Sequence, residues 1–133
     1  MKYLIYLVFI LSNLSCSPFL KYSQSYRQFE EEVSLLESLD SEEKAGENDV
    51  LFIGSSSIRL WENIQLDMYP YSSVKRGYGG AHFYDLIHFS DRLVKNHSPK
   101  AILIFIANDI TGLNDSTNLV GDLSPSDVKK LFR

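Results

Sequence analysis

Three short segments of this chain carry residues that could do chemistry together. They are Gly54-Ser55-Ser56-Ser57, Gly77-Tyr78-Gly79-Gly80 and Ala107-Asn108-Asp109. A serine hydroxyl can serve as the nucleophile in acyl transfer. An amide group or an exposed backbone N–H can stabilise the negative oxygen that forms in the transition state. A hydroxyl, a glycine-rich turn and an amide are therefore the parts of an ester-cleaving site, provided that the fold brings them to one place.

Each of the three segments follows a run that predicts a strand; the first and third runs are apolar, whereas the second, Ser73-Val74-Lys75-Arg76, is a weak strand pattern. The runs cover residues 50–53, 73–76 and 101–106, and a helix with an apolar face is predicted between the last two, from Phe83 to Val94. Strands that alternate with helices imply a parallel sheet with right-handed crossovers. The carboxyl ends of parallel strands share one edge of the sheet, where ligands bind. The sequence therefore places Ser56, Gly80 and Asn108 around one crevice.

The remaining predicted elements complete an α-β-α-β-α-β-α pattern. Apolar residues at helical spacing predict a helix over 26–39, and a short helix is expected over 58–64. A last helix should begin at Pro125, with Ser124 as its N-cap. We predict an α/β fold with a flavodoxin-like parallel sheet flanked by helices. In the strand order 2-1-3 the first and third strands are neighbours, so Ser56 and Asn108 would face each other.

The three segments resemble the first three sequence blocks of the SGNH, or GDSL-type, hydrolases. The resemblance covers about residues 48–112 and places the nucleophile at Ser56, with Ser55 where that family usually has Asp. It places oxyanion donors at Gly80 and Asn108, with Ile106 where a Gly is usual. It implies a serine esterase that cleaves acyl esters, acetyl esters in the first place, of carbohydrates or small molecules. No metal and no organic cofactor is implied.

The chain departs from that family mainly in the base of the site. In the family, the base and the group that orients it come from an Asp-x-x-His near the C-terminus, and this chain has no such motif there. Asp85 and His88 have the spacing but fall inside a predicted helix. His82, close to Gly80, is a candidate substitute base. We therefore expect residues 26–133 to be the N-terminal part of a hydrolase domain, truncated after the third strand and nearly inactive alone.

Plainer interpretations of the same residues stay open. Ser55 and Ser57 could cap a helix, the turn at 77–80 could simply need a positive φ, and Asn108 with Asp109 could close a loop. Trp61 and Tyr78 are expected to pack. An alternative function is an inactive fragment or pseudoenzyme that acts as a binding module. A phosphate- or flavin-binding domain is a further alternative, although the glycine-rich phosphate motifs are missing.

Composition narrows the class of protein. The 133 residues are 44% hydrophobic and carry a net charge of −4 without a basic cluster. One domain of ordinary size with a packed core is expected, and nucleic acid is excluded as a partner. The expected partner is a small-molecule or carbohydrate ester, and the oligomeric state stays open.

The N-terminus predicts export. Residues 1–16 combine Lys2, a short apolar run and small residues that end at Cys16, the only cysteine. The run is shorter than the roughly 20 residues that span a bilayer. Leu14-Ser15-Cys16 resembles the lipobox of bacterial lipoproteins, so we expect a lipid anchor at Cys16, a tether over 17–25 and a periplasmic or outer-membrane location. A soluble exported protein and a buried first strand or helix are the alternatives.

Overall fold

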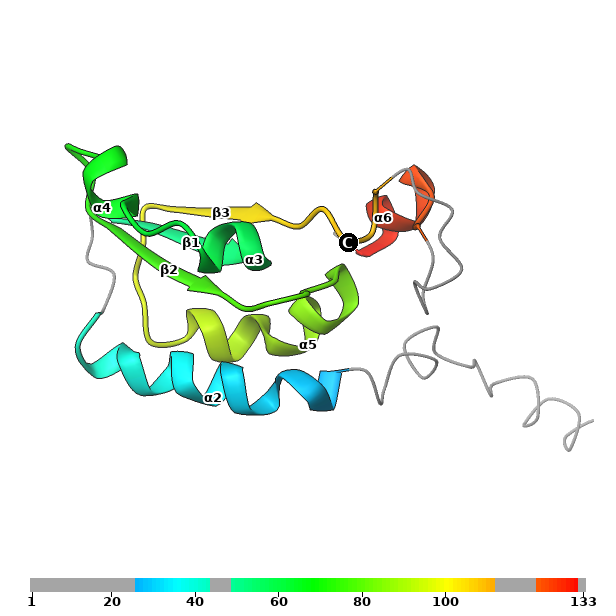
Figure 1. Ribbon diagram of the computed structural model, residues 1–133, viewed down its shortest axis with the longest axis horizontal. Coiled ribbons are helices and arrows are strands. Elements are labelled where there is room, and N and C mark those ends of the chain that lie inside the picture. Colours follow the sequence, from blue (N-terminus) through cyan, green and yellow to red (C-terminus); the bar gives the residue numbers. More distant parts are fainter. Residues whose placement is uncertain (1–25, 44–48, 112–121, 132–133) are drawn as a thin grey trace, which may run out of the picture.

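A three-stranded parallel sheet forms the centre of the protein (Figure 1). The computed structural model describes residues 26–43, 49–111 and 122–131. The predicted export signal, Cys16 and the tether lie outside these residues. The strands are β1 (Val50–Gly54), β2 (Ser73–Gly77) and β3 (Ala101–Phe105), in the order β2-β1-β3. This order confirms the predicted flavodoxin-like α/β fold.

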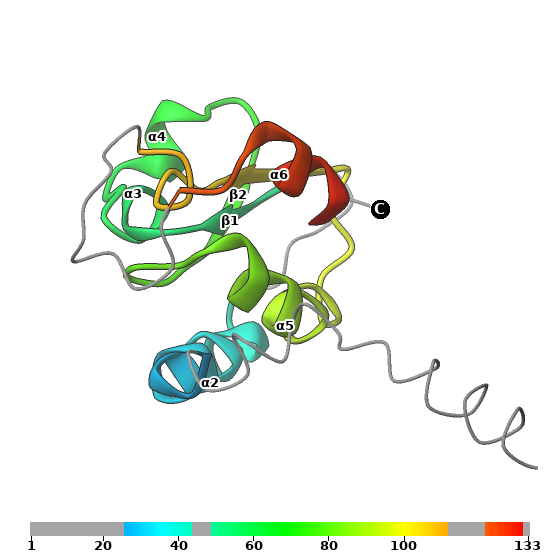
Figure 2. The same ribbon diagram turned by 90° about the vertical axis from the view of Figure 1, so that its right-hand side faces the viewer.

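Helices cover the two faces of the sheet unequally. Long helices α2 (Glu30–Ser38) and α5 (Phe83–Val94) lie on one face, and the short helices α3 (Ser56–Arg59) and α4 (Ile64–Asp67) lie on the other (Figure 2). Single 3-10 turns, Tyr26–Phe29 and Leu39–Ser41, flank α2. No helix within the described ranges is long and apolar enough to cross a membrane.

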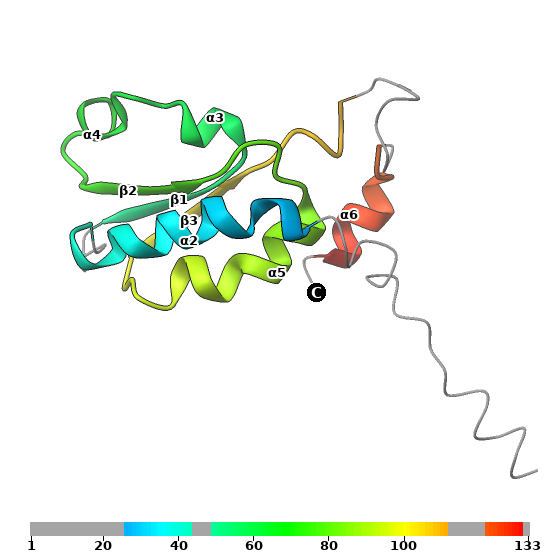
Figure 3. The same cartoon turned by 60° about the horizontal axis from the view of Figure 1, so that its bottom comes forward.

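The last helix, α6 (Pro125–Leu131), packs against α5 near the carboxyl ends of the strands (Figure 3). Its predicted N-cap is confirmed, because the Ser124 Oγ accepts a hydrogen bond from the Asp127 N–H at 3.2 Å.

The core has two parts because β1 is buried on both faces. Leu51 and Ile53 point toward α2 and α5, and Phe52 points toward α3 and α4. The larger cluster lies under α2 and α5 and consists of Phe29, Val33, Leu51, Ile53, Val74, Tyr78, Ala81, Phe83, Leu86, Phe89, Leu93 and Ile106. The smaller cluster consists of Phe52, Ile58 and Ile64, with Val50, Trp61 and Met68 packed against it.

The prediction of a single helix over 58–64 is wrong. The chain forms two one-turn helices, α3 and α4, separated by residues 60–63. The break lets Ile58 and Ile64 both reach Phe52, and Trp61 packs edge-to-face on Phe52 with ring centroids 5.4 Å apart. Burial of this small apolar cluster outweighs the local helical pattern.

A buried ion pair fixes the end of α2 to the sheet. The Arg76 side chain, fully buried in β2, donates from Nε and Nη2 to the Asp40 Oδ1 at 3.0 and 2.9 Å. His97 and Asn96, after α5, also contact this carboxylate. Burial alone would raise the pKa of Asp40, but the hydrogen bonds from Asn96 and Arg76 outweigh burial and lower it. Three segments therefore share one buried charge, and none of them can move alone.

Among the described residues, strand β3 lies at one edge of the sheet and carries apolar side chains on both faces. Ile102, Leu103, Ile104 and Phe105 are between 44% and 52% exposed. Apolar hollows flank the strand, one against Phe83 and Leu86 of α5 and the other against Phe52 and Trp61. An exposed apolar strand at the edge of a sheet is prone to pair with other chains.

A lysine on this edge should reduce self-association. We expect Leu103→Lys to raise the soluble, monomeric fraction while the circular dichroism spectrum stays unchanged, because Leu103 is already 45% exposed. Light scattering coupled to gel filtration measures the effect. Leu60→Lys, at a 67% exposed position away from the sheet edge, is the matched control. Equal self-association in both variants and the parent would contradict a role of the β3 edge.

Candidate active site

One side chain connects the loops that follow all three strands. The Asn108 Nδ2, after β3, donates to the Ser55 Oγ at 2.8 Å, after β1. The same nitrogen donates to the Ala81 carbonyl oxygen at 2.8 Å, after β2. The structure thus brings the three segments singled out in the sequence to one edge of the sheet. The chemical roles of their residues remain predictions.

Ser55 and Ser56 differ in surroundings. Ser55 is the N-cap of α3 and is 3% exposed, but its hydroxyl accepts the Asn108 hydrogen bond and makes no capping bond. Ser56 is the first residue of α3 and is half-buried. Of the two serines, Ser56 is therefore the more exposed, and the Ser55 hydroxyl is held by Asn108.

Glycines allow the close approach of the loops. A Cβ on Gly54 would lie 2.1 Å from the carbonyl oxygen of Phe105, so only glycine lets β1 end this close to the end of β3. Gly80 has φ +74°, in the left-handed region that favours glycine, as the turn interpretation of the sequence expects. The Gly79 N–H donates to the Glu32 carboxylate at 3.2 Å, and Gly80 is exposed. Gly80 therefore remains the candidate oxyanion donor of this turn.

The side-chain amide of Asn108 has no free N–H group in this structure. Both N–H groups of its amide are engaged, one on Ser55 and one on Ala81. An incoming oxyanion must replace one of these acceptors before Asn108 can stabilise it. In the structure described here, the amide acts as a brace between loops.

His82 and Asp109 form a pair that the sequence did not predict. The Asp109 carboxylate is fully buried, and its Oδ1 lies 2.7 Å from the His82 Nδ1. Its Oδ2 accepts a hydrogen bond from the Phe83 N–H at 2.6 Å. The bond to Asp109 raises the pKa of His82, against the lowering effect of burial. A carboxylate on Nδ1 leaves Nε2 as the nitrogen that can take a proton.

The sequence signal that could have identified this pair is that both residues lie just after the end of a predicted strand. Sequence reasoning named His82 as a substitute base, but it interpreted Asp109 only as a loop residue. Asp109 follows Asn108 after β3, as His82 follows Gly80 after β2. Parallel strands bring such positions together, although the distance between the two side chains depends on the loops.

The other histidines lie away from this edge. His88 stacks on Tyr26, with ring centroids 3.9 Å apart, and His97 contacts Asp40. Asp85 does not serve His88: its carboxylate accepts hydrogen bonds from the Tyr78 hydroxyl at 2.7 Å and from the His82 N–H at 3.0 Å. Burial, opposed by these two hydrogen bonds, raises the pKa of Asp85 to about 6. The expected packing role of Tyr78 fits its full burial.

Comparisons with known proteins give one structural likeness. No family model matches the chain, and no curated protein matches it. A solved structure from Streptococcus pneumonia, provisionally described as a platelet activating factor, is similar with a TM-score of 0.51 at 22% sequence identity. The match takes in 68% of this chain and 43% of that one. At this identity the likeness shows the fold alone.

Replacing Asp85 with Asn should change how stability depends on pH. The native pKa of about 6 lies above the unfolded value of about 3.9, so the native state keeps a proton that the unfolded state has lost. This contribution to stability therefore falls as the pH rises from about 4 to about 6. The Asp85→Asn variant has no titrating group at this position, so its stability does not fall in this way. The free energy of unfolding of the variant minus that of the parent should therefore rise by about 2–3 kcal/mol between pH 4 and pH 6.

Urea unfolding at pH 4 and pH 7 measures this difference. Asp91→Asn, an exposed aspartate on the same helix, controls for the loss of one charge. A variant-to-parent difference that does not change with pH would show that Asp85 ionises as an ordinary carboxyl group.

Proposed function

We propose that this chain carries the nucleophile and oxyanion donors of a serine esterase. The observation that supports it best is the pair of Asn108 hydrogen bonds, which hold the serine loop and the glycine turn against each other. Ser56, which is half-buried, follows Ser55 directly and begins α3. The fold similarity to the streptococcal structure is compatible with the proposal but does not identify a reaction.

The proposed reaction follows the chemistry of acyl transfer. The Ser56 Oγ attacks the ester carbonyl carbon while a base takes the hydroxyl proton. Backbone N–H groups of Ser56 and Gly80 and the amide of Asn108 hold the oxygen that becomes negative, and one such donor is typically worth about 3–4 kcal/mol. Collapse of the intermediate releases the alcohol, and water then cleaves the acyl-enzyme. Asn108 would give up one of its present acceptors when the oxyanion forms.

The base is the open part of this proposal. His82, oriented by Asp109, is the histidine of the described residues that lies at this edge of the sheet. No hydrogen bond joins its ring to Ser56 among the described residues, so catalysis through His82 needs the two side chains to approach when substrate binds. The other candidate is an Asp-x-x-His pair supplied from outside this sequence, as the family resemblance implies.

The rival function is a binding module without catalysis. The full engagement of the Asn108 amide favours it, because no donor of that side chain is free for an oxyanion. Export, a lipid anchor at Cys16 and acetyl esters of carbohydrates or small molecules belong to the proposal as expectations from the sequence.

An active-site label should identify the nucleophile. A fluorophosphonate should modify Ser56, and Ser56→Ala should abolish the labelling, because the hydroxyl oxygen forms the covalent bond. Ser57→Ala, the exposed neighbouring serine, is the matched control and should be labelled normally. Peptide mass spectrometry locates the label. Labelling that persists in Ser56→Ala would assign the nucleophile elsewhere, and no labelling of the parent would favour the binding module.

His82 can be tested as the base by the rate of p-nitrophenyl acetate cleavage. If His82 accepts the proton, His82→Ala should slow the reaction by about 10²–10⁴-fold. The parent rate should increase with pH through a pKa above about 6.5, since only the neutral ring accepts a proton. His88→Ala is the control. A rate that depends on Ser56 but not on His82 would place the base outside the described residues.

A further inference from the structure

One carboxylate joins the glycine turn to the helix that begins with the candidate nucleophile. The Gly79 N–H donates to both oxygens of the Glu32 carboxylate, each at 3.2 Å. The Glu32 Oε1 also accepts a hydrogen bond from the Arg59 Nη1 at 3.1 Å, which makes an ion pair. Arg59 is the last residue of α3, the helix in which Ser56 comes first. Glu32 therefore has one partner on each of two segments that carry the candidate site.

This ion pair reaches around the end of strand β2. Glu32 belongs to α2, which lies on one face of the sheet, and Arg59 belongs to α3 on the other face (Figure 2). Strand β2 lies at one edge of the sheet, because the strand order is β2-β1-β3. An added Cβ on Gly79 would lie 2.9 Å from the Arg59 Nη1 and 3.0 Å from its Cζ. The guanidinium group therefore packs directly on the turn.

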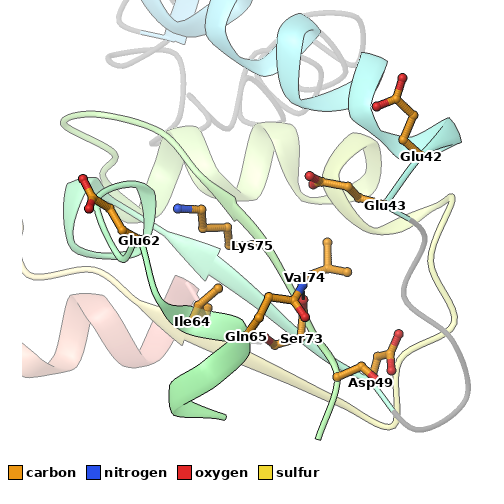
Figure 4. A pocket seen from close by; sticks show the side chains of 10 residues that line it. Glu42, Glu43, Asp49, Glu62, Ile64, Gln65, Ser73, Val74 and Lys75 are labelled. Atoms are coloured by element: carbon orange, nitrogen blue, oxygen red, sulfur yellow. Dashed lines mark hydrogen bonds between the residues drawn. The ribbon is translucent and has the colours of Figure 1, made fainter. Parts of the chain in front are cut away.

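The backbone of Arg59 is itself held in place. The Lys75 ammonium group donates to the carbonyl oxygens of Arg59 at 3.0 Å and of Trp61 at 2.9 Å. Figure 4 shows the Lys75 side chain reaching from β2 toward the loop that carries Glu62. A Cβ on Gly77 would lie only 2.7 Å from the Arg59 backbone nitrogen, so the end of α3 lies on the end of β2. The Arg59 side chain thus extends from a fixed point.

The candidate oxyanion donor Gly80 depends on the residue before it. Two glycines in succession leave the backbone free to take many conformations. Gly80 is exposed, and its N–H makes no hydrogen bond within the described part of the chain. The preceding N–H, that of Gly79, is the one that Glu32 holds. The carboxylate therefore fixes the backbone directly before the candidate donor.

Positioning explains this ion pair better than stability does. The side chains of Arg59 and Glu32 are 47% and 32% exposed, and exposed pairs of this kind contribute little to stability. A lone carboxylate beside the turn would oppose negative charge on a substrate oxygen, and the guanidinium group offsets it. We propose that Glu32 is a positioning residue, which orients the Gly80 N–H for the oxyanion by holding Gly79. Arg59 keeps the carboxylate in place, and this role rests on the proposed esterase function.

The rate at which a fluorophosphonate labels Ser56 in the full chain tests this role. Glu32→Ala should lower the maximal labelling rate about tenfold, less than the roughly 10²–10³-fold effect of a missing donor, because the Gly80 N–H is still present. The half-saturating concentration should stay unchanged, since an oxyanion donor acts in the transition state. Glu32→Gln should retain most of the rate, because its amide oxygen can accept the Gly79 hydrogen bond.

Two further variants separate this role from a structural one. Glu31→Ala changes the exposed glutamate that precedes Glu32 on α2, and it should leave the labelling rate unchanged. Arg59→Met should slow labelling in the parent but have no further effect in Glu32→Ala, because Arg59 acts through Glu32. A lower midpoint of thermal unfolding for Glu32→Ala at an unchanged labelling rate would mean that Glu32 only stabilises the fold, and would overturn the proposal.

Amide hydrogen exchange, measured by NMR, keeps this test apart from that of the esterase. Glu32→Ala should speed the exchange of the Gly79 N–H more than Glu31→Ala does, whether or not Ser56 is the nucleophile. Unchanged exchange would show that Glu32 does not hold the turn. Labelling at Ser56 that is insensitive to Glu32→Ala would overturn the positioning role alone. No labelling of the parent would refute the esterase function, and this role with it.

Discussion

The two hydrogen bonds of the Asn108 amide are the constraint on which the candidate active site depends. They join a serine hydroxyl after β1 to a carbonyl oxygen after β2, from a side chain after β3. The backbone supports the same contact, because the Ser55 N–H donates to the Phe105 carbonyl oxygen at 3.1 Å. Glycine at position 54 makes that approach possible. The contact of His82 with Asp109 and the hydrogen bond from the Tyr78 N–H to the Gly54 carbonyl oxygen at 3.1 Å add to this brace.

Buried carboxylates form the layer beneath the brace. Asp109 orients His82, and Asp85 holds both the His82 backbone and the Tyr78 hydroxyl. Their surroundings differ, because Asp109 faces an imidazole whereas Asp85 faces neutral donors. The pKa of Asp85 is therefore raised to about 6, mainly by burial. The raised pKa values of Asp85 and His82 give this edge of the sheet a response to pH near neutrality.

Charge of a different kind fixes helix α2 to the sheet. Arg76 is fully buried, and its guanidinium group shares the Asp40 carboxylate with the side chains of His97 and Asn96. A buried pair of this kind contributes little net stability, but removing one partner leaves a charge without compensation. The pair therefore fixes where α2 lies on the sheet, and α2 in turn supplies Glu32 to the Gly79 N–H at the active-site edge. Contacts near both ends of α2 therefore fix this helix against β2 and the glycine turn.

The sequence by itself determined the strands, their parallel order and the edge at which the site lies. Apolar runs such as 50–53 are local patterns, and the helical face of 83–94 follows from spacing alone. Tertiary structure decided that Ser55 is buried and bonded to Asn108 whereas Ser56 is partly exposed. It also decided the pairing of His82 with Asp109, 27 residues apart, and the break of the helix between Ile58 and Ile64. These features depend on contacts between residues far apart in the chain, and no local periodicity encodes such contacts.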